Sequence, residues 1–297
     1  FVKSYSKCEF YDILVFVKRF VTTVVVPQYI REIAPYAFNE CTYLREVKFS
    51  NKSELKIIGD HAFCNSGIAK IKIPSSVTFI GEKAFCKCKK LTKVDFDPNS
   101  KLKTINKKLF CYSEIEVLSI PSNIEKLNES WCCHTKGLNT IILDNPRFVY
   151  YENKFLLGQS NPKSDIFDVL LFANRDIKTA EIPSFIKEIA PYAFEQCYLL
   201  NSVYFPADSE LQIIDKHAFY FSSFESVRIP SRVTEIRKKA FSIQKLDNVE
   251  FESNPKFILI HYTAFNIHTI PFFKNLYFQK LPNYYKTQMK RIQDETF

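Results

Sequence analysis

The chain has 297 residues, of which 46% are hydrophobic and 25% charged, proportions that are ordinary for a folded domain. No run approaches the roughly 20 consecutive apolar residues of a membrane-spanning helix, so we predict no transmembrane segment. The net charge of +9 keeps a protein soluble and favours an acidic partner. Because the lysines lack an RNP or zinc-finger framework, the sequence argues against nucleic acid as that partner.

In chain order, the first clear pattern is IREIAPYAF, which ends at Phe38 and returns as IKEIAPYAF at Phe194. The match continues, since His61-Ala62-Phe63 corresponds to His217-Ala218-Phe219. The chain is therefore roughly a half-array that has been duplicated.

Within each half a shorter unit recurs, with the template IPxxVxxIxxxAFxxCxxLxxVxF. One unit buries five or six apolar anchors, worth about 1.5–3 kcal/mol each. Ordering costs about 1.5 kcal/mol per residue, so a unit should be stable only when stacked on its neighbours. The Ala-Phe (once Leu-Phe) anchors end at Phe38, Phe63, Phe85, Phe110, Phe194, Phe219, Phe241 and Phe265.

The LxxVxF part of each unit alternates apolar residues at its end, which is typical of a β-strand. The strands predicted in this way are Leu44–Phe49, Ile68–Ile73, Leu91–Phe96, Ile115–Ile120, Leu138–Leu143, Leu200–Phe205, Phe224–Ile229, Leu246–Phe251 and Phe273–Phe278.

The template resembles the BspA-like subclass of leucine-rich-repeat proteins, whose signature is AFxxCxxLxxVxFP, over about Val24 to Phe278. The resemblance implies an α/β fold: a right-handed solenoid with a parallel sheet on its concave face. Short strands and tight helical turns would lie on the convex side. The best-known members are surface and secreted proteins of bacteria and parasitic protists, and they are associated with adhesion to host cells and matrix proteins.

We interpret the chain as one solenoid with five segments. These are an N-terminal cap (1–25), a first repeat block (26–143), an irregular hairpin-like repeat (144–181), a second block (182–278) and a C-terminal cap (279–297) that contains a short amphipathic helix at 284–297. The 5 glycines indicate few loops with positive φ. Because the chain begins with Phe1, we expect a processed form or a fragment, and a missing signal peptide says nothing about secretion.

The 9 cysteines do not show paired CxxC spacing, so we predict no metal site and no cofactor. Four of them follow the anchor position in consecutive coils and should form a column of small buried thiols. A disulfide between neighbours remains open if their Cα atoms lie within about 6.8 Å. These four cysteines are Cys64, Cys86, Cys111 and Cys133.

A catalytic hypothesis rests only on His134, which directly follows Cys132 and Cys133. Nucleophilic catalysis also needs a positioned base and an oxyanion site, and the sequence supplies neither. No Walker loop, HExxH or GxSxG motif occurs. We therefore predict that the protein is not an enzyme.

The candidate ligand-binding residues are outward positions of the predicted concave strands. The early coils carry a basic stripe that would steer an acidic partner, and the later coils carry mixed charges with tyrosines. Tyr and Arg are enriched at binding hot spots, although polar residues on an exposed sheet equally serve solubility. The candidates are Arg45, Lys48, Lys70, Lys72, Lys93, Tyr204, Arg228 and Tyr277.

The resulting hypothesis is a non-enzymatic protein-binding module, on the cell surface or secreted, that adheres to a host or matrix protein. The alternative is an intracellular scaffold in the cytoplasm or on the cytoskeleton, which the odd number of cysteines and their reduced column favour. An exposed terminal coil would also allow a homodimer.

Overall fold

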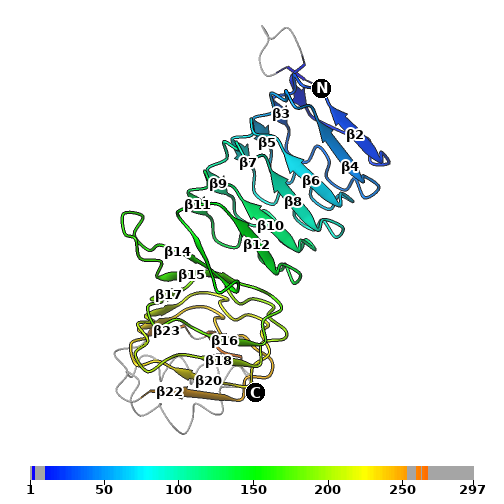
Figure 1. The fold of residues 1–297 in the computed structure, drawn as a ribbon. Helices are drawn as coiled ribbons and strands as arrows, with labels where there is room; N and C mark the ends of the chain where they lie inside the picture. Colours follow the sequence, from blue (N-terminus) through cyan, green and yellow to red (C-terminus); the bar gives the residue numbers. More distant parts are fainter. Residues whose placement is uncertain (1, 4–10, 253–258, 262, 267–297) are drawn as a thin grey trace. The chain divides into compact units, whose positions relative to one another are not determined.

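The computed structural model describes residues 2–3, 11–252, 259–261 and 263–266. They belong to two compact units, Phe1–Asp165 and Ile166–Phe297 (Figure 1). In both units the chain winds through successive coils whose strands pair in parallel with those of the neighbouring coils. The division into five segments and their stacking as one solenoid stay predictions.

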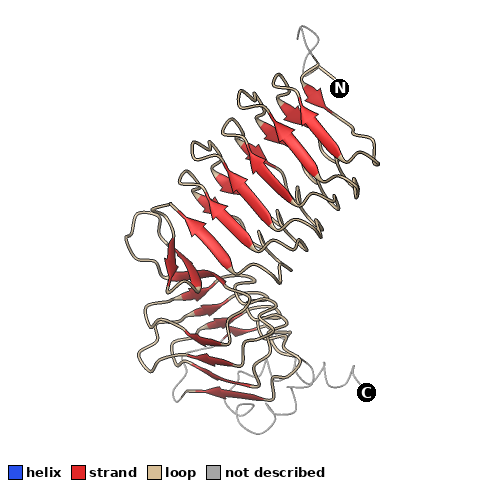
Figure 2. Cartoon of the chain, turned by 45° about the vertical axis from the view of Figure 1, so that its right-hand side comes forward, coloured by secondary structure: helices blue, strands red, loops and turns tan. Residues whose placement is uncertain are grey.

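The first unit carries two ladders of parallel strands on different sides of the coil (Figures 1 and 2). One ladder is built from two-residue strands: β1 (Ile13–Leu14), β3 (Glu32–Ile33), β5 (Ile57–Ile58), β7 (Phe79–Ile80), β9 (Thr104–Ile105) and β11 (Lys126–Leu127). The other has four-residue strands: β2 (Thr23–Val26), β4 (Glu46–Phe49), β6 (Lys70–Ile73), β8 (Lys93–Phe96), β10 (Val117–Ile120) and β12 (Thr140–Leu143).

The irregular segment of the first unit forms an antiparallel hairpin of β13 (Val149–Tyr151) and β14 (Phe155–Gly158). The second unit repeats the two ladders. Its first ladder contains β15 (Val169–Ala173), β17 (Glu188–Ile189), β19 (Ile213–Ile214), β21 (Glu235–Ile236) and β23 (Leu259–Ile260). Its second contains β16 (Thr179–Glu181), β18 (Ser202–Tyr204), β20 (Ser226–Ile229) and β22 (Asn248–Phe251). Strand pairing along the ladders is interrupted between β7 and β9, between β4 and β6, and between β18 and β20.

The predicted strands are found, but they begin about two residues late. In the first complete coil the strand starts at Glu46 rather than Leu44. The Leu44 amide donates to the Cys41 carbonyl at 3.0 Å, so this residue still belongs to the preceding turn. The last predicted strand, Phe273–Phe278, and the predicted helix at 284–297 lie outside the described residues.

The core of each unit is a column of stacked phenylalanine rings contributed by the Ala-Phe anchors. Phe63 is fully buried, and its ring centroid lies 4.6 Å from that of Phe38 and 5.3 Å from that of Phe85. In the second unit, Phe219 is stacked in the same way between Phe194 and Phe241. Each ring is thus buried by its equivalents in the neighbouring coils. A single coil would leave its Phe ring exposed, so we do not expect it to be stable alone.

The turns that carry these anchors are not helical, so the predicted α/β class is wrong. All elements of the described residues are strands. In the first turn, the Ala37 and Cys41 amides donate to carbonyls three residues back, those of Ala34 and Phe38, whereas the Phe38 amide donates to Ala62 of the next coil at 2.7 Å. A helix requires each amide to bond within its own segment. Here every second amide bonds to the next coil, and the protein is a β-solenoid of parallel strands.

Left-handed backbone conformations occur twice in most of these turns, for example at Tyr36 (φ 62°) and Glu40 (φ 61°), then at His61 (φ 54°) and Asn65 (φ 56°). The alternation of handedness directs every second amide toward the neighbouring coil. The expectation that few loops have positive φ is wrong, because non-glycine residues adopt it throughout the described chain. Each costs on the order of 1–3 kcal/mol, and the hydrogen bonds between coils offset that cost.

A partly buried ionic cluster in the second unit makes its stability depend on pH. Burial, and then repulsion by Asp215, raise the pKa of Glu188, although Arg237 opposes the rise. A raised carboxyl pKa means that ionisation is disfavoured in the folded state. The cost is absent below the ordinary pKa of 4.5 and grows as pH rises through the folded pKa.

We therefore expect Glu188→Gln to raise the free energy of unfolding at pH 7 and to change it little near pH 4. Urea unfolding at both pH values, followed by circular dichroism, measures the difference. The control is Glu32→Gln at the equivalent position, whose neighbouring coils carry Gly59 and Gly81 in place of Asp215 and Arg237. If the free energy of unfolding rose equally in the two variants at pH 7, or if the rise persisted at pH 4, ionisation of Glu188 would not be the source of the cost.

Candidate binding face on the longer strands

The four-residue strands of the first unit present a regular exposed surface because apolar and polar residues alternate along them. In β6, Lys70 and Lys72 are exposed, whereas Ile71 and Ile73 are buried. The parallel register places equivalent residues side by side, so that Lys70 lies next to Lys93 and Lys72 next to Asp95. We call the exposed side of β2, β4, β6, β8, β10 and β12, together with Arg45 immediately before β4, the long-strand face (Figure 2).

Ion pairs partly neutralise the predicted basic stripe on this face. Lys48 pairs with Glu46 on its own strand at 3.3 Å, and Lys93 pairs with Asp95 at 3.0 Å. Lys72 reaches Asp97 only at 4.0 Å. Pairs as exposed as these contribute about 0–1 kcal/mol to stability. Their main effect here is to offset the positive charge of lysines that the sequence pattern had assigned to the basic stripe.

Two cations of the long-strand face have no ion pair within the described residues. Arg45 and Lys70 are exposed, and within the described residues neither has a carboxylate partner. The Arg45 amide is bonded to the Thr22 carbonyl at 2.7 Å, which fixes the backbone from which this side chain projects. Lys70 lies in register with a second lysine, Lys93. The positive potential of the face is therefore concentrated at these two residues.

Apolar side chains occupy both ends of the same face. Val25 in β2 is 68% exposed and lies in register with Lys48, and Ile142 in β12 is 53% exposed. The sequence interpretation assigned Val25 to a cap and did not select it. The signal was present in the alternation of Thr23–Val26, where Val26 is buried and Val25 is not. An exposed apolar residue beside a cation suits contact with a protein.

The second unit presents a shorter equivalent face. Tyr204 in β18 is 58% exposed and lies in register with Glu181. Arg228 in β20 lies in register with Glu250, and its Nε is 3.9 Å from Glu252. The mixed charge expected for these coils is therefore found, and Arg228 is compensated. Tyr277 lies outside the described residues.

Stacked coils with parallel strands, a column of Phe anchors and one exposed face of longer strands define a β-solenoid of the leucine-rich-repeat class. Repeats of this class are protein-interaction modules and are generally non-enzymatic. The chain belongs to the family of the BspA type leucine rich repeat region, whose model matches residues 14–139 and 167–295 in 6 copies. The family resemblance found in the sequence is thereby confirmed.

Solved structures show the same fold. The pneumococcal vaccine antigen PcpA superposes with a TM-score of 0.68 at 21% identity, over 84% of this chain and 67% of that one. A leucine-rich repeat protein from Eubacterium ventriosum gives 0.65 at 19% identity, over 81% and 61%. A leucine rich cell surface protein from Faecalibacterium prausnitzii gives 0.52 at 19%, over 78% and 79%. At these identities the likeness concerns the fold alone.

Comparison with curated proteins gives no significant match. Within the described ranges, no helix has the length and hydropathy needed to span a bilayer.

Proposed function

We propose that this protein is a non-enzymatic binding module, exposed on the cell surface or secreted, that adheres to a host or matrix protein through the long-strand face. The observation that carries the proposal is the long-strand face itself: two neighbouring runs of in-register strands, β2–β4 and β6–β8–β10–β12, with exposed side chains, among which Arg45 and Lys70 are the cations without a carboxylate partner in the described residues. The solved relatives support the location, since they include a vaccine antigen and a cell surface protein.

The chemistry of this face favours an acidic partner with apolar contacts at its edges. Uncompensated surface cations steer the encounter with such a partner and so act mainly on the association rate. Val25 and Ile142 would then provide the apolar contact area, because burying exposed apolar surface contributes to affinity at about 25 cal/mol per Å² before the costs of association.

We expect the double variant Arg45→Glu/Lys70→Glu to lower the association rate with an adhesive partner roughly 10-fold at low ionic strength. The loss should shrink as salt is added, because the interaction is screened. Surface plasmon resonance against a panel of purified matrix proteins measures it. Lys126→Glu is the matched control, since Lys126 is exposed on the two-residue ladder in β11. Equal rates for the double variant and the wild type would refute a role for these cations.

The location is tested by labelling intact source cells with a membrane-impermeant biotin reagent. Strong labelling supports adhesion, whereas recovery of unlabelled protein from the lysate or the cytoskeletal pellet supports an intracellular scaffold. The scaffold alternative is favoured by one observation, that no disulfide joins the cysteines within the described residues, as expected in a reducing compartment.

A further inference from the structure

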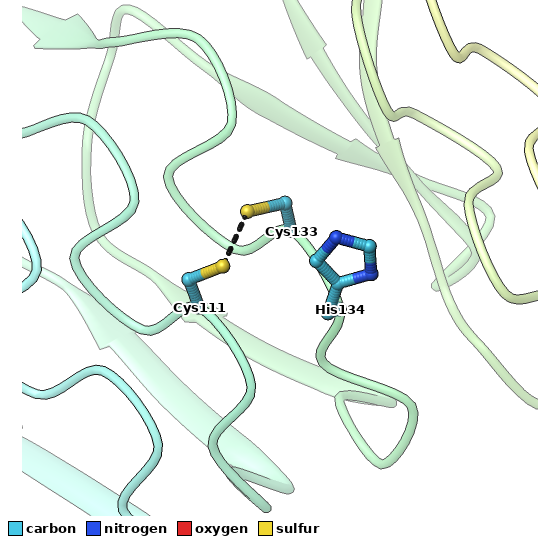
Figure 3. A group of neighbouring side chains, drawn as sticks. All are labelled: Cys111, Cys133 and His134. Atoms are coloured by element: carbon cyan, nitrogen blue, oxygen red, sulfur yellow. Dashed lines mark hydrogen bonds between the residues drawn. The ribbon is translucent and has the colours of Figure 1, made fainter. Parts of the chain in front are cut away.

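The predicted column of cysteines forms along the Ala-Phe turns of the first unit. Cys64, Cys86, Cys111 and Cys133 are all buried. Hydrogen bonds between their side chains run along the column, from Cys64 to Cys86 and from Cys86 to Cys111. At the last step of the column, Cys133 Sγ donates to Cys111 Sγ at 2.8 Å (Figure 3).

Backbone hydrogen bonds between adjacent coils bring these last two thiols together. The Phe110 amide donates to the Trp131 carbonyl at 3.0 Å, and the Tyr112 amide donates to the Cys133 carbonyl at 3.2 Å. These bonds flank Cys111 on both sides and hold its coil in register with the next. The proximity of the two sulfurs is therefore built into the solenoid, although the residues are 22 positions apart in the sequence.

An imidazole completes the group. His134 has a left-handed φ of 57°, and its ring lies beside Cys133 in Figure 3. Its ring also stacks on Tyr112 with a centroid separation of 4.1 Å, which restricts its orientation. A nitrogen of His134 and the sulfurs of Cys111 and Cys133 all lie within 4.8 Å of one another, and no other such group of three is found in the described part of the chain.

We propose that Cys111, Cys133 and His134 bind one zinc ion that links the last two coils before the hairpin of β13 and β14. Two thiolates and one imidazole are ligands that zinc prefers, and a water molecule would take the fourth tetrahedral position. With Zn–S bonds of about 2.3 Å, tetrahedral geometry needs the sulfurs about 1 Å further apart than they are now. A small rotation of the two side chains provides that separation. In the sequence these cysteines lack paired CxxC spacing and fit a column of small buried thiols, so the pattern gave no sign of a metal site.

Metal binding would stabilise this part of the protein directly. The ion would crosslink two coils that backbone hydrogen bonds already hold together, and the binding free energy would add to the folding free energy. Each thiol releases its proton to solvent on binding, so the 2.8 Å hydrogen bond between them is replaced by two zinc–sulfur bonds.

The test uses the full chain, reduced, incubated with zinc sulfate and desalted, with bound metal measured by mass spectrometry. We expect about one zinc per chain and a higher thermal unfolding midpoint. Cobalt in place of zinc should give thiolate-to-metal charge-transfer absorption.

His134→Ala and Cys133→Ser should lower zinc affinity at least about 100-fold, because even outer-shell changes cost about 10–100-fold. Cys64→Ser, at the far end of the same column, should leave it unchanged.

Several outcomes would overturn the proposal. They are a reduced wild-type chain that retains no zinc, cobalt binding without a thiolate band, or equal zinc retention by the His134→Ala variant. A Cys111–Cys133 disulfide that forms in the purified protein and does not give way to zinc under reducing conditions would overturn it as well. If Cys133→Ser does not fold, two measurements still test the proposal. One is zinc retention by His134→Ala, which should fold because His134 is half-exposed, and the other is the cobalt spectrum of the wild type.

Discussion

Replacing Phe63 by alanine should lower the free energy of unfolding by about 3–5 kcal/mol, the usual cost of removing a buried Phe. Phe63 is fully buried and stacks on Phe38 and Phe85, so the variant also loses two ring contacts. The cavity should not collapse easily, because the amides of Phe38 and Phe63 fix the spacing of the coils by donating to the next coil at 2.7 and 2.8 Å. Urea unfolding followed by circular dichroism measures the change.

Phe79→Ala is the matched control, because it makes the same chemical change in the same unit. Phe79 lies in β7 on the two-residue ladder and is 46% exposed, so its removal should cost under about 1 kcal/mol. Hydrogen exchange adds a local measurement: in Phe63→Ala, the amides of Phe63 and Cys64 should lose protection first. Similar unfolding midpoints for the two variants would show that the ring column does not hold the coils together.

The column itself could be predicted from the sequence. The Ala-Phe anchors recur in register, and a repeat that cannot bury its own apolar residues must bury them against its equivalents. The cysteine column follows from the same recurrence in register, and the alternation in segments such as Lys70–Ile73 indicates which lysines are exposed. These features depend only on the period of the pattern, which the sequence states directly.

The turn conformation could not be obtained in this way. A segment such as Ile33–Phe38 is compatible with a helical turn by composition, and glycine is absent from the positions that need positive φ. What decides the conformation is the neighbouring coil, whose carbonyls accept every second amide. The turn conformation therefore depends on tertiary hydrogen bonds, and it cannot be predicted from the helix propensity of the segment alone. The α/β class failed for this reason, while the solenoid and its parallel strands were predicted correctly.

The charges of the binding face show a similar limit. The sequence pattern indicates that Lys48 and Lys93 point outward, but not that Glu46 and Asp95 on the same strands lie within ion-pair distance of them. The choice of rotamer and of partner is made in three dimensions. Only the structure distinguishes Arg45 and Lys70 as the cations without an ion pair among the described residues. The approach of His134 to two cysteines is likewise visible only in the structure.

Replacing Arg175 by alanine should destabilise the second unit by about 1–3 kcal/mol, because it removes charge-assisted hydrogen bonds from a buried guanidinium, although the Ala193 and Tyr192 carbonyls keep the backbone amides of Ala173 and Glu195 as donors. Arg175 is 3% exposed, and its guanidinium donates to the Ala193 carbonyl at 2.8 Å and to the Tyr192 carbonyl at 3.2 Å. It also lies over the Phe172 ring, 4.5 Å from the centroid. Arg175→Lys should recover only part of the loss, since an ammonium cannot reproduce the planar fork of donors.

The duplication of the chain provides an internal control for this prediction. Arg19 is the counterpart of Arg175, by the same offset that relates Phe38 to Phe194. Its guanidinium makes a long contact of 3.7 Å to Cys41 Sγ and lies over the exposed ring of Phe16. A weak sulfur acceptor at a half-buried site gives little stabilisation, so Arg19→Ala should cost less than about 1 kcal/mol. If the two alanine variants lowered the urea midpoint equally, the stabilisation would come from the arginine's place in the repeat rather than from the buried carbonyls it bonds, and the burial argument would be wrong.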